Sequence, residues 1–261
     1  MDFAFSFAGF VVGFIVGMTG VGGGSLMTPI LVLVFAIKPS LAVGTDLLYA
    51  SITKAGGIWV HQQNGTVQWQ VVGRLALGSL PSSLAMVWVL QTLQARGIGY
   101  EGLLSTTLGI ALILTSLAIL FRAQIIRLAQ NPQFEGLRSF HQRFQISLTV
   151  LAGAILGTLV TLSSVGAGAL GVVMLFALYP RLPSRQIVGT DLAHAVPLTA
   201  IAGLGHAHLG TVDYRLLAFL LLGSLPGIFL GSHMGVKLPD SVVRPALAAM
   251  LLMIGLKFAA A

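Results

Sequence analysis

Two aspartates stand in the same four-residue motif, Val-Gly-Thr-Asp, in two distant parts of the chain. Asp46 lies in AVGTDLLYA and Asp191 in IVGTDLAHA, both within strongly apolar stretches. A carboxylate inside an apolar helix is costly, so such residues often mark proton relays, gates or ion pathways. We expect Asp46 and Asp191 to serve in proton coupling or gating. The alternative is a carboxylate near a helix start that caps the helix and interacts with its dipole.

Two further ionisable side chains lie close to these aspartates along the chain. Lys54 follows Asp46 in ASITKAGG and could bind an anion; the alternative is a lysine that snorkels to the cytoplasmic surface. His194 lies one turn after Asp191 on the same helix face, so it could handle protons, or it could be a neutral, hydrogen-bonded histidine. The other histidines near helix ends have no metal-ligand company and are expected at the membrane interface: His61, His206 and His208.

The densest glycine cluster, GVGGGS at residues 20–25, lies between two apolar stretches, and SVGAGAL at residues 164–170 is its counterpart. Neither matches the spacing of a nucleotide-binding loop. Glycines permit a helix break, and a helix that restarts there directs its amino-terminal N–H groups toward an anion. The alternative is glycine for helix packing alone. The residues expected to bind substrate at the two breaks are Gly22, Gly23, Gly24, Ser25, Ser163, Ser164, Gly166 and Gly168. A serine there could instead bond its own backbone.

Composition identifies the environment that positions these residues. Of 261 residues, 56% are hydrophobic and 8% charged, and the mean hydropathy is +0.94. Apolar runs close to the length of a membrane-spanning helix recur along the chain. The net charge of +7 comes from Lys and Arg dispersed in short connectors, which argues against nucleic-acid binding. The chain has no cysteine, so disulfides and thiolate chemistry are excluded. The sequence predicts an integral membrane protein.

An internal repeat with an offset of 145 residues relates the two halves of the chain. The matching pairs are Asp46 with Asp191, His61 with His206, Gly65 with Gly210 and Gly78 with Gly223. At an offset of 144 residues, one less than that of the other pairs, Gly9 and Gly13 match Gly153 and Gly157. Their spacing lets membrane helices pack closely.

The expected elements are five helical segments in each half, with the first two segments of each half meeting at the glycine-rich break. The ranges are 3–19, 24–37, 41–61, 68–90 and 101–121, then 144–163, 168–180, 185–206, 212–234 and 241–260. The second segment of each half spans only about 20 Å as helix and cannot comfortably cross a bilayer alone. The sequence predicts an all-α polytopic membrane protein with broken helices.

The basic connectors predict orientation and domain organisation. We divide the chain into a first membrane repeat, 1–121, a cytoplasmic linker, 122–143, and a second membrane repeat, 144–261. The linker carries four arginines and is expected in the cytoplasm: Arg122, Arg127, Arg138 and Arg143. Both termini are then extracytoplasmic, the first helix is retained rather than cleaved, and the two repeats are inverted relative to each other. Inverted repeats with paired helix breaks are typical of secondary transporters.

These motifs resemble one known family. GVGGGSLMTPIL, AVGTDLLYASITKAGG, SVGAGALGVVML and IVGTDLAHAVPLTAIAG are similar to the TauE/SafE family, whose members are often called sulfite or organosulfur-anion exporters. The resemblance implies a multi-pass inner-membrane carrier that exports a small sulfur-containing anion by using a proton or ion gradient. It also implies that Thr45 and Thr190, in the helix motifs of the family, bind the substrate.

The expected partners are a small anion, the lipid bilayer and, as an option, a second copy of the chain. We expect no cofactor and no nucleic acid. Two other functions stay open: an intramembrane hydrolase that uses a serine with His194, and an anion channel. A channel would need a polar stripe or a charged ring through the membrane, and none is visible in the sequence.

Overall fold

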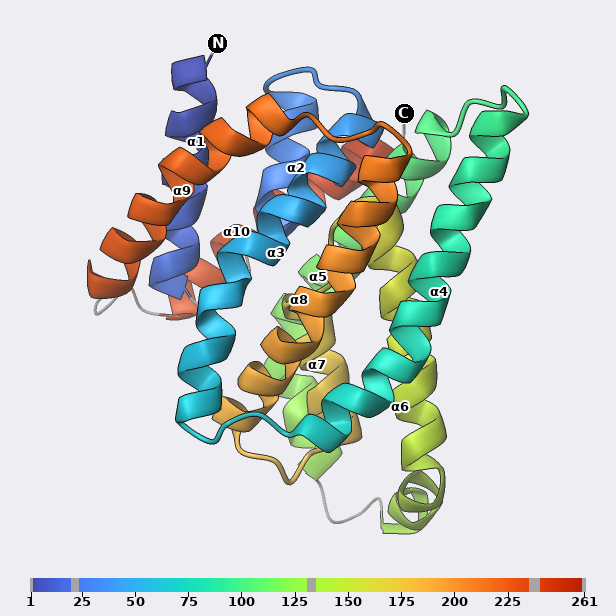
Figure 1. Ribbon diagram of the computed structural model, residues 1–261. Helices are drawn as coiled ribbons and strands as arrows, with labels where there is room; N and C mark the ends of the chain where they lie inside the picture. Colours follow the sequence, from blue (N-terminus) through green and yellow to red (C-terminus); the bar gives the residue numbers. More distant parts are fainter. Residues whose placement is uncertain (1, 20–23, 131–134, 235–239, 260–261) are drawn as a thin grey trace.

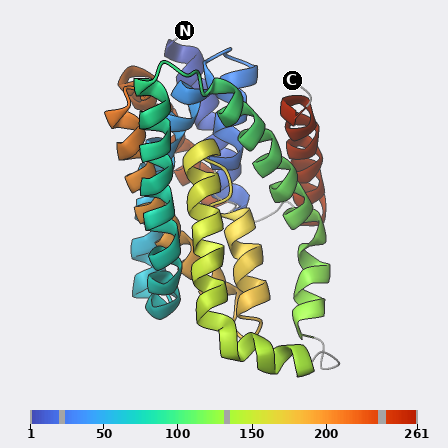
Figure 2. The ribbon, with the colours of Figure 1, turned by 90° about the vertical axis from the view of Figure 1, so that its right-hand side faces the viewer.

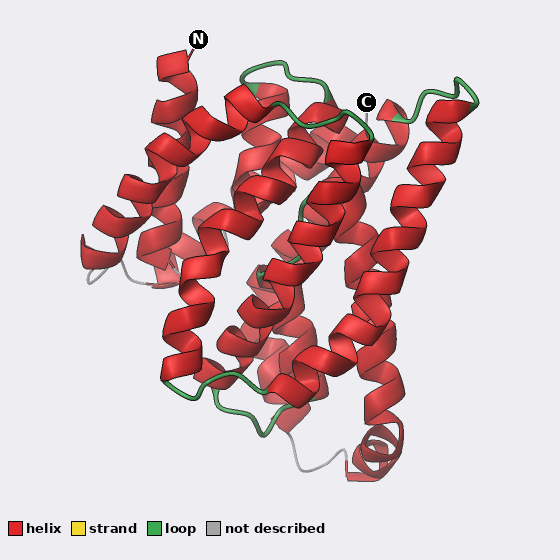
Figure 3. Cartoon of the chain, in the orientation of Figure 1, coloured by secondary structure: helices red, strands yellow, loops and turns green. Residues whose placement is uncertain are grey.

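A computed structural model describes residues 2–19, 24–130, 135–234 and 240–259, and every element in these ranges is an α-helix. Figure 3 shows these helices and the loops that join them. The first half contains α1 (Asp2–Thr19), α2 (Gly24–Leu33), α3 (Pro39–Gln63), α4 (Trp69–Ala95) and α5 (Glu101–Gln130). The second half contains α6 (Glu135–Ser163), α7 (Ala169–Leu178), α8 (Ser184–His208), α9 (Tyr214–Met234) and α10 (Asp240–Ala259). The predicted all-α fold class is confirmed.

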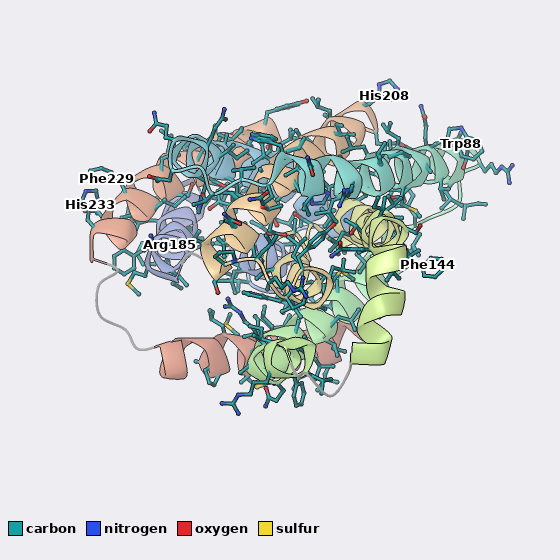
Figure 4. All side chains as sticks on the ribbon, turned by 90° about the horizontal axis from the view of Figure 1, so that it is seen from below. Trp88, Phe144, Arg185, His208, Phe229 and His233 are labelled. Carbon is teal, nitrogen blue, oxygen red and sulfur yellow. The ribbon has the colours of Figure 1, made fainter. Side chains whose placement is uncertain are left out.

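Length and composition identify the helices that can cross a bilayer. Within the described residues, five helices contain apolar stretches long enough to span: α4, α5, α6, α8 and α9. Large apolar side chains also project outward from the molecule, among them Trp88, Phe144 and Phe229 (Figure 4). An exterior of this kind suits contact with lipid, and the chain is a multi-pass membrane protein.

Two helices extend into the polar linker. Apolar content predicts helix ends at 121 and 144, but α5 continues to Gln130 and α6 begins at Glu135. The sequence FRAQIIRLAQ interrupts the apolar run with two arginines and two glutamines, but it is rich in good helix formers, so the helix continues past the predicted end. Figure 2 shows the first turns of α6 bending away from the rest of that helix.

The two short helices end earlier than predicted. The helix α2 ends at Leu33 rather than 37, and α7 ends at Leu178 rather than 180. Pro39 disfavours helical geometry in the residue before it, and Ala36 has a positive φ of 52°. The connector between α2 and α3 is therefore a tight turn.

Helices of one half pack against helices of the other in matching pairs: α1 packs on α9 as α6 packs on α4, and α3 packs on α8. The glycine faces make these crossings close. A Cβ atom added at Gly9 would overlap the Leu220 carbonyl, and one added at Gly153 would overlap that of Leu75. Gly13 meets Ser224 and Gly157 meets Ser79 in the same way. The predicted packing role of these glycines is confirmed.

The two halves run in opposite directions. Both chain ends lie at one end of the molecule, and the gap between α5 and α6 lies at the other (Figure 1). Matching helices such as α3 and α8 point in opposite directions in this view. The short helix α7 returns alongside α6 toward the end where α6 begins (Figure 2). The break between α6 and α7 is thus the tip of a hairpin inside the molecule.

Candidate functional site

Asp46 lies at the centre of the first repeat. It is fully buried in α3, and its Oδ2 accepts a 2.5 Å hydrogen bond from the Thr28 hydroxyl of α2. Its Oδ1 has no hydrogen-bond partner, and the Ser164 hydroxyl, also unpartnered, faces this carboxyl group. Asp46 therefore joins α2 to the break of the other repeat. It does not cap α3, because it lies several residues inside that helix and bonds another one.

Lys54 lies two turns beyond Asp46 on α3 and reaches into the second break. Its Nζ donates a 2.9 Å hydrogen bond to the carbonyl of Ala167, between α6 and α7. The residue is 8% exposed, so the ammonium is inside the protein and does not snorkel to the surface. Lys54 interacts electrostatically with both Asp191 and Asp46. One lysine is thus shared by the two motif aspartates.

Asp191 lies against the start of the short helix α7. Its Oδ1 is buried and has no hydrogen-bond partner. A Cβ atom added at Gly171, in the first turn of α7, would overlap this oxygen. Asp191 lies several residues inside α8 and therefore is not the cap of its own helix. Its carboxylate contacts the amino-terminal turn of a different helix.

The second break has the backbone geometry that its glycines predict. Gly166 and Gly168 have φ values of 120° and 133°, which L side chains rarely adopt. Ser164 has a φ of 59°, and the first repeat has Gly20 at this position. Gly168 precedes α7 and provides no side-chain cap. No side chain therefore caps α7, and the N–H groups of Gly171 and Val172 donate to the carbonyls of Gly166 and Gly168 at 3.0 and 2.9 Å.

The other predicted residues of the breaks have different positions. Ser163 donates to the Leu159 carbonyl at 2.6 Å and accepts from the Val165 N–H at 3.1 Å, so its hydroxyl serves its own backbone. Gly24 and Ser25 are the first two residues of α2. Gly22 and Gly23 lie outside the described residues.

The motif threonines hold the two repeats together. The Thr45 hydroxyl accepts a 3.0 Å bond from the Asp213 N–H, and the Thr190 hydroxyl accepts a 3.0 Å bond from the Gln68 N–H. Each donor lies just before a helix of the opposite repeat, α9 or α4. The structure does not bring these hydroxyls together with Asp46 or Asp191.

The motif glycines were not predicted as contact residues, although they belong to the same repeat. A Cβ atom at Gly44 would overlap the Thr211 carbonyl, and one at Gly189 would lie 2.8 Å from the Thr66 carbonyl. Val-Gly-Thr-Asp therefore combines a close approach, a hydrogen-bond acceptor and a central carboxylate in three successive residues.

His194 bonds a serine rather than a carboxylate. Its Nε2 lies 2.7 Å from the Ser79 hydroxyl of α4, and its Nδ1 is buried without a partner. In the other repeat the matching residues are Tyr49 and Ser224, which also face each other. Because a tyrosine replaces the histidine there, the pair is better explained as a contact between helices than as a catalytic dyad. Ser79 is also fully buried.

Two histidines expected at the interface have structural partners. His206 is fully buried, and its two ring nitrogens bond Thr211 at 2.9 Å and the Thr161 carbonyl at 2.9 Å. The His206 ring is buried inside the protein because the loop that follows α8 folds back over it. His61 bonds Thr66 at 2.8 Å in the matching arrangement, while His208 is exposed (Figure 4). Among the described residues, no group of three or more His, Asp or Glu side chains could hold a metal ion.

Comparison with known proteins decides the family. The model of the family described as "Sulfite exporter TauE/SafE" matches residues 5–258. The chain belongs to the TauE/SafE family. It is 39% identical over 249 residues to the "Probable membrane transporter protein YjnA" of Bacillus subtilis, covering 95% of this chain and 96% of that protein.

More distant relatives of this TauE/SafE chain carry similar names. It is 26% identical to the "Probable membrane transporter protein YdhB" of Bacillus subtilis, over 94% of this chain and 97% of that protein. It is 24% identical to the "Probable membrane transporter protein MJ0441" of Methanocaldococcus jannaschii, over 93% of this chain and 88% of that protein. No solved structure matches the chain.

Proposed function

We propose that this TauE/SafE protein is a secondary transporter that exports a small sulfur-containing anion such as sulfite or an organosulfonate. Transport proceeds by alternating access and is coupled to a proton or ion gradient. The protein resides in the cell inner membrane with both termini outside. The observation that carries the proposal is the buried ammonium of Lys54 at the break between α6 and α7.

The chemistry of this break favours an anion. Lys54 contributes a positive charge, and α7 directs its first N–H groups and the positive end of its dipole into the same region. Both lie where two interlocked repeats meet, as expected for a carrier whose halves rock about a central site. Sulfite and sulfonates present several acceptor oxygens, which suits a site that offers donors.

The two alternatives have less support. A hydrolase would need the Ser79–His194 pair to be accessible, but Ser79 is fully buried and the matching pair contains a tyrosine. A channel would need a continuous polar path, whereas the buried polar groups gather around the breaks and the helix crossings.

Flux measurements in liposomes test the proposal. Wild-type protein should transport sulfite or ethanesulfonate, and Lys54→Met should lower the rate by at least about tenfold because a fixed charge is lost. Lys257→Met is the matched control, because this lysine is exposed in the last turn of α10; it should transport normally. The same flux in Lys54→Met and wild type would contradict the assigned site.

A further inference from the structure

We infer that the Asp191 carboxylate occupies, at the start of α7, the place that a transported anion takes, and that binding of the anion is accompanied by uptake of one proton on Asp191. This inference rests on the function proposed above. It adds the identity of the coupling ion and the direction in which that ion moves relative to the anion.

The position of the carboxylate is the first observation. Asp191 is 4% exposed, and its Oδ1 has no hydrogen-bond partner. This oxygen lies so close to Gly171 that a methyl group there would overlap it. Gly171 is in the first turn of α7, at the positive end of the helix dipole, and its own N–H donates to the Gly166 carbonyl at 3.0 Å. A buried carboxyl group of the protein therefore already lies at the helix start.

The charges around Asp191 are the second observation. From α3 it faces Lys54, and on α8 itself the nearest titratable group is His194, which bonds Ser79 of α4. The helix α7 and residues 144–163 of α6 carry no charged side chain. Lys54 also interacts with Asp46, so one positive charge serves two carboxylates. Among the residues that the structure describes, Lys54 is the cation that interacts with Asp191, whereas Arg74 of α4, which also packs on α8, donates to the Tyr179 hydroxyl at 3.4 Å.

An anion that enters this site therefore meets a like charge in a water-poor environment, where repulsion is strong. One proton bound to Asp191 removes the repulsion: the carboxylate becomes a neutral carboxyl group, and no other bond forms or breaks. The anion then interacts with Lys54 and with the start of α7. Release of the anion restores the original arrangement and returns the proton. A monoanion and a proton consequently cross the membrane together, without net charge. An inward proton gradient therefore favours uptake, so export along this route is driven by the outward concentration gradient of the anion itself.

The lysine that reaches the second break has no counterpart for the first break. The residue that matches Lys54 is Thr199, whose hydroxyl bonds the Ala195 carbonyl of its own helix at 2.9 Å. Asp46 already accepts a hydrogen bond from Thr28. No lysine thus extends from the second repeat to the first break at this position. The asymmetry assigns one anion and one coupling carboxyl group to each cycle.

Binding of ethanesulfonate to purified protein tests the inference. This sulfonate keeps one negative charge from about pH 5.5 to 8.5, so only protein groups titrate. Calorimetry in two buffers of different ionisation enthalpy counts the protons taken up. We expect about one proton per anion, and an affinity that rises by about tenfold for each unit that the pH falls while Asp191 is ionised in the free protein.

Variants assign the proton to its carrier. Asp191→Asn should bind ethanesulfonate with an affinity that does not change with pH and without proton uptake. Asp2→Asn is the control, because that carboxylate lies at the surface and pairs with Arg215; it should keep the slope and proton count of the wild type. Melting curves in detergent verify that both variants are folded, and the proton count of the wild-type protein needs no variant.

Different failures have different meanings. Wild-type binding that is independent of pH, without proton uptake, would overturn this inference while leaving anion transport intact. Uptake of one proton by folded Asp191→Asn would place the proton elsewhere and would also overturn it. If neither ethanesulfonate nor sulfite binds or crosses the membrane at any pH, the proposed function fails and the inference fails with it.

Discussion

At the scale of single residues, the adjacent threonine and aspartate of the repeated motif have different roles, although the motif is the same in both repeats. Thr45 and Thr190 stand beside the two central aspartates, yet their hydroxyls accept N–H groups from loops of the opposite repeat. Successive side chains on a helix point about 100° apart, so neighbours in a motif face different surroundings. The threonine bonds join the repeats, while both aspartates face the break between α6 and α7.

A conservative substitution tests this division. Thr190→Val keeps the shape of the side chain but leaves the Gln68 N–H without its acceptor, so the free energy of unfolding should fall by about 1–3 kcal/mol. Thr53→Val is the control, because that hydroxyl bonds a carbonyl of its own helix and should be nearly neutral. Thermal melting and ethanesulfonate titration measure both effects. A Thr190→Val protein of normal stability that no longer binds the anion would place this hydroxyl in the binding site instead.

The sequence could predict the positions of some of these residues but not of others. The repeat was enough to predict that Asp46 and Asp191 approach the middle, because matching positions in two related halves meet near their pseudo-symmetry axis. It could not predict that Lys54 bonds Ala167, since this contact joins residues 113 apart and has no counterpart in the other repeat. The burial of His206 depends on the loop that folds over it, which periodicity does not report.

At the scale of elements, the glycines fall into two classes that look alike in sequence. Gly9 and Gly153 lie on helix faces where another backbone passes within contact distance. Gly166 and Gly168 have positive φ values in the break, and Gly166 has only ordinary contacts around an added Cβ atom, at 3.6 Å and beyond. In the first class, lack of space excludes a larger side chain. In the second class, the positive φ of the backbone disfavours any other residue.

Alanine substitutions should separate these classes. At Gly9 a methyl group overlaps the Leu220 carbonyl, so Gly9→Ala should lower the melting temperature before it lowers anion affinity. At Gly166 the cost is a strained φ, of order 1–3 kcal/mol, which the break can relieve by changing shape. Gly166→Ala should therefore weaken ethanesulfonate binding more than it lowers the melting temperature. Parallel losses of stability and affinity in both variants would show that the break is a packing device and that the anion binds elsewhere.

The sequence predicts a helix bound correctly where the change in apolar composition coincides with the end of the helix. It misses the bound where the helix continues beyond the apolar stretch. The starts of α5, α8 and α9 lie within two residues of the predicted positions because turn residues and polarity change there together. The extension of α5 to Gln130 was missed because FRAQIIRLAQ becomes less apolar without losing helix propensity. Hydropathy reports where a helix leaves the membrane, and propensity reports where the helix ends.

At the scale of the whole molecule, the opposite directions of the two halves place α3 and α8 side by side. The break between α6 and α7 lies against both, because Lys54 of α3 bonds Ala167 and Asp191 of α8 lies against Gly171. Each repeat also supplies the packing partner of the other, as α1 does with α9 and α6 with α4. A relative movement of the repeats would therefore shift close glycine crossings and the central charges together.

Membrane topology is the prediction that belongs to this scale. The arginines of 122–143 predict a cytoplasmic linker, and the structure places the chain ends at the opposite end of the molecule from the gap in that linker. Reporter domains fused after Ala261 and inserted within 131–134 should consequently lie on opposite sides of the membrane. Paired fusions measure this, one active only in the cytoplasm and one only outside. A fusion after residue 98, in the loop that follows α4, is a control and should match the report from Ala261, because both lie at the same end of the molecule. Cytoplasmic signals from both Ala261 and the linker would contradict the inverted arrangement, since an odd number of crossings must separate those two points if the halves are inverted.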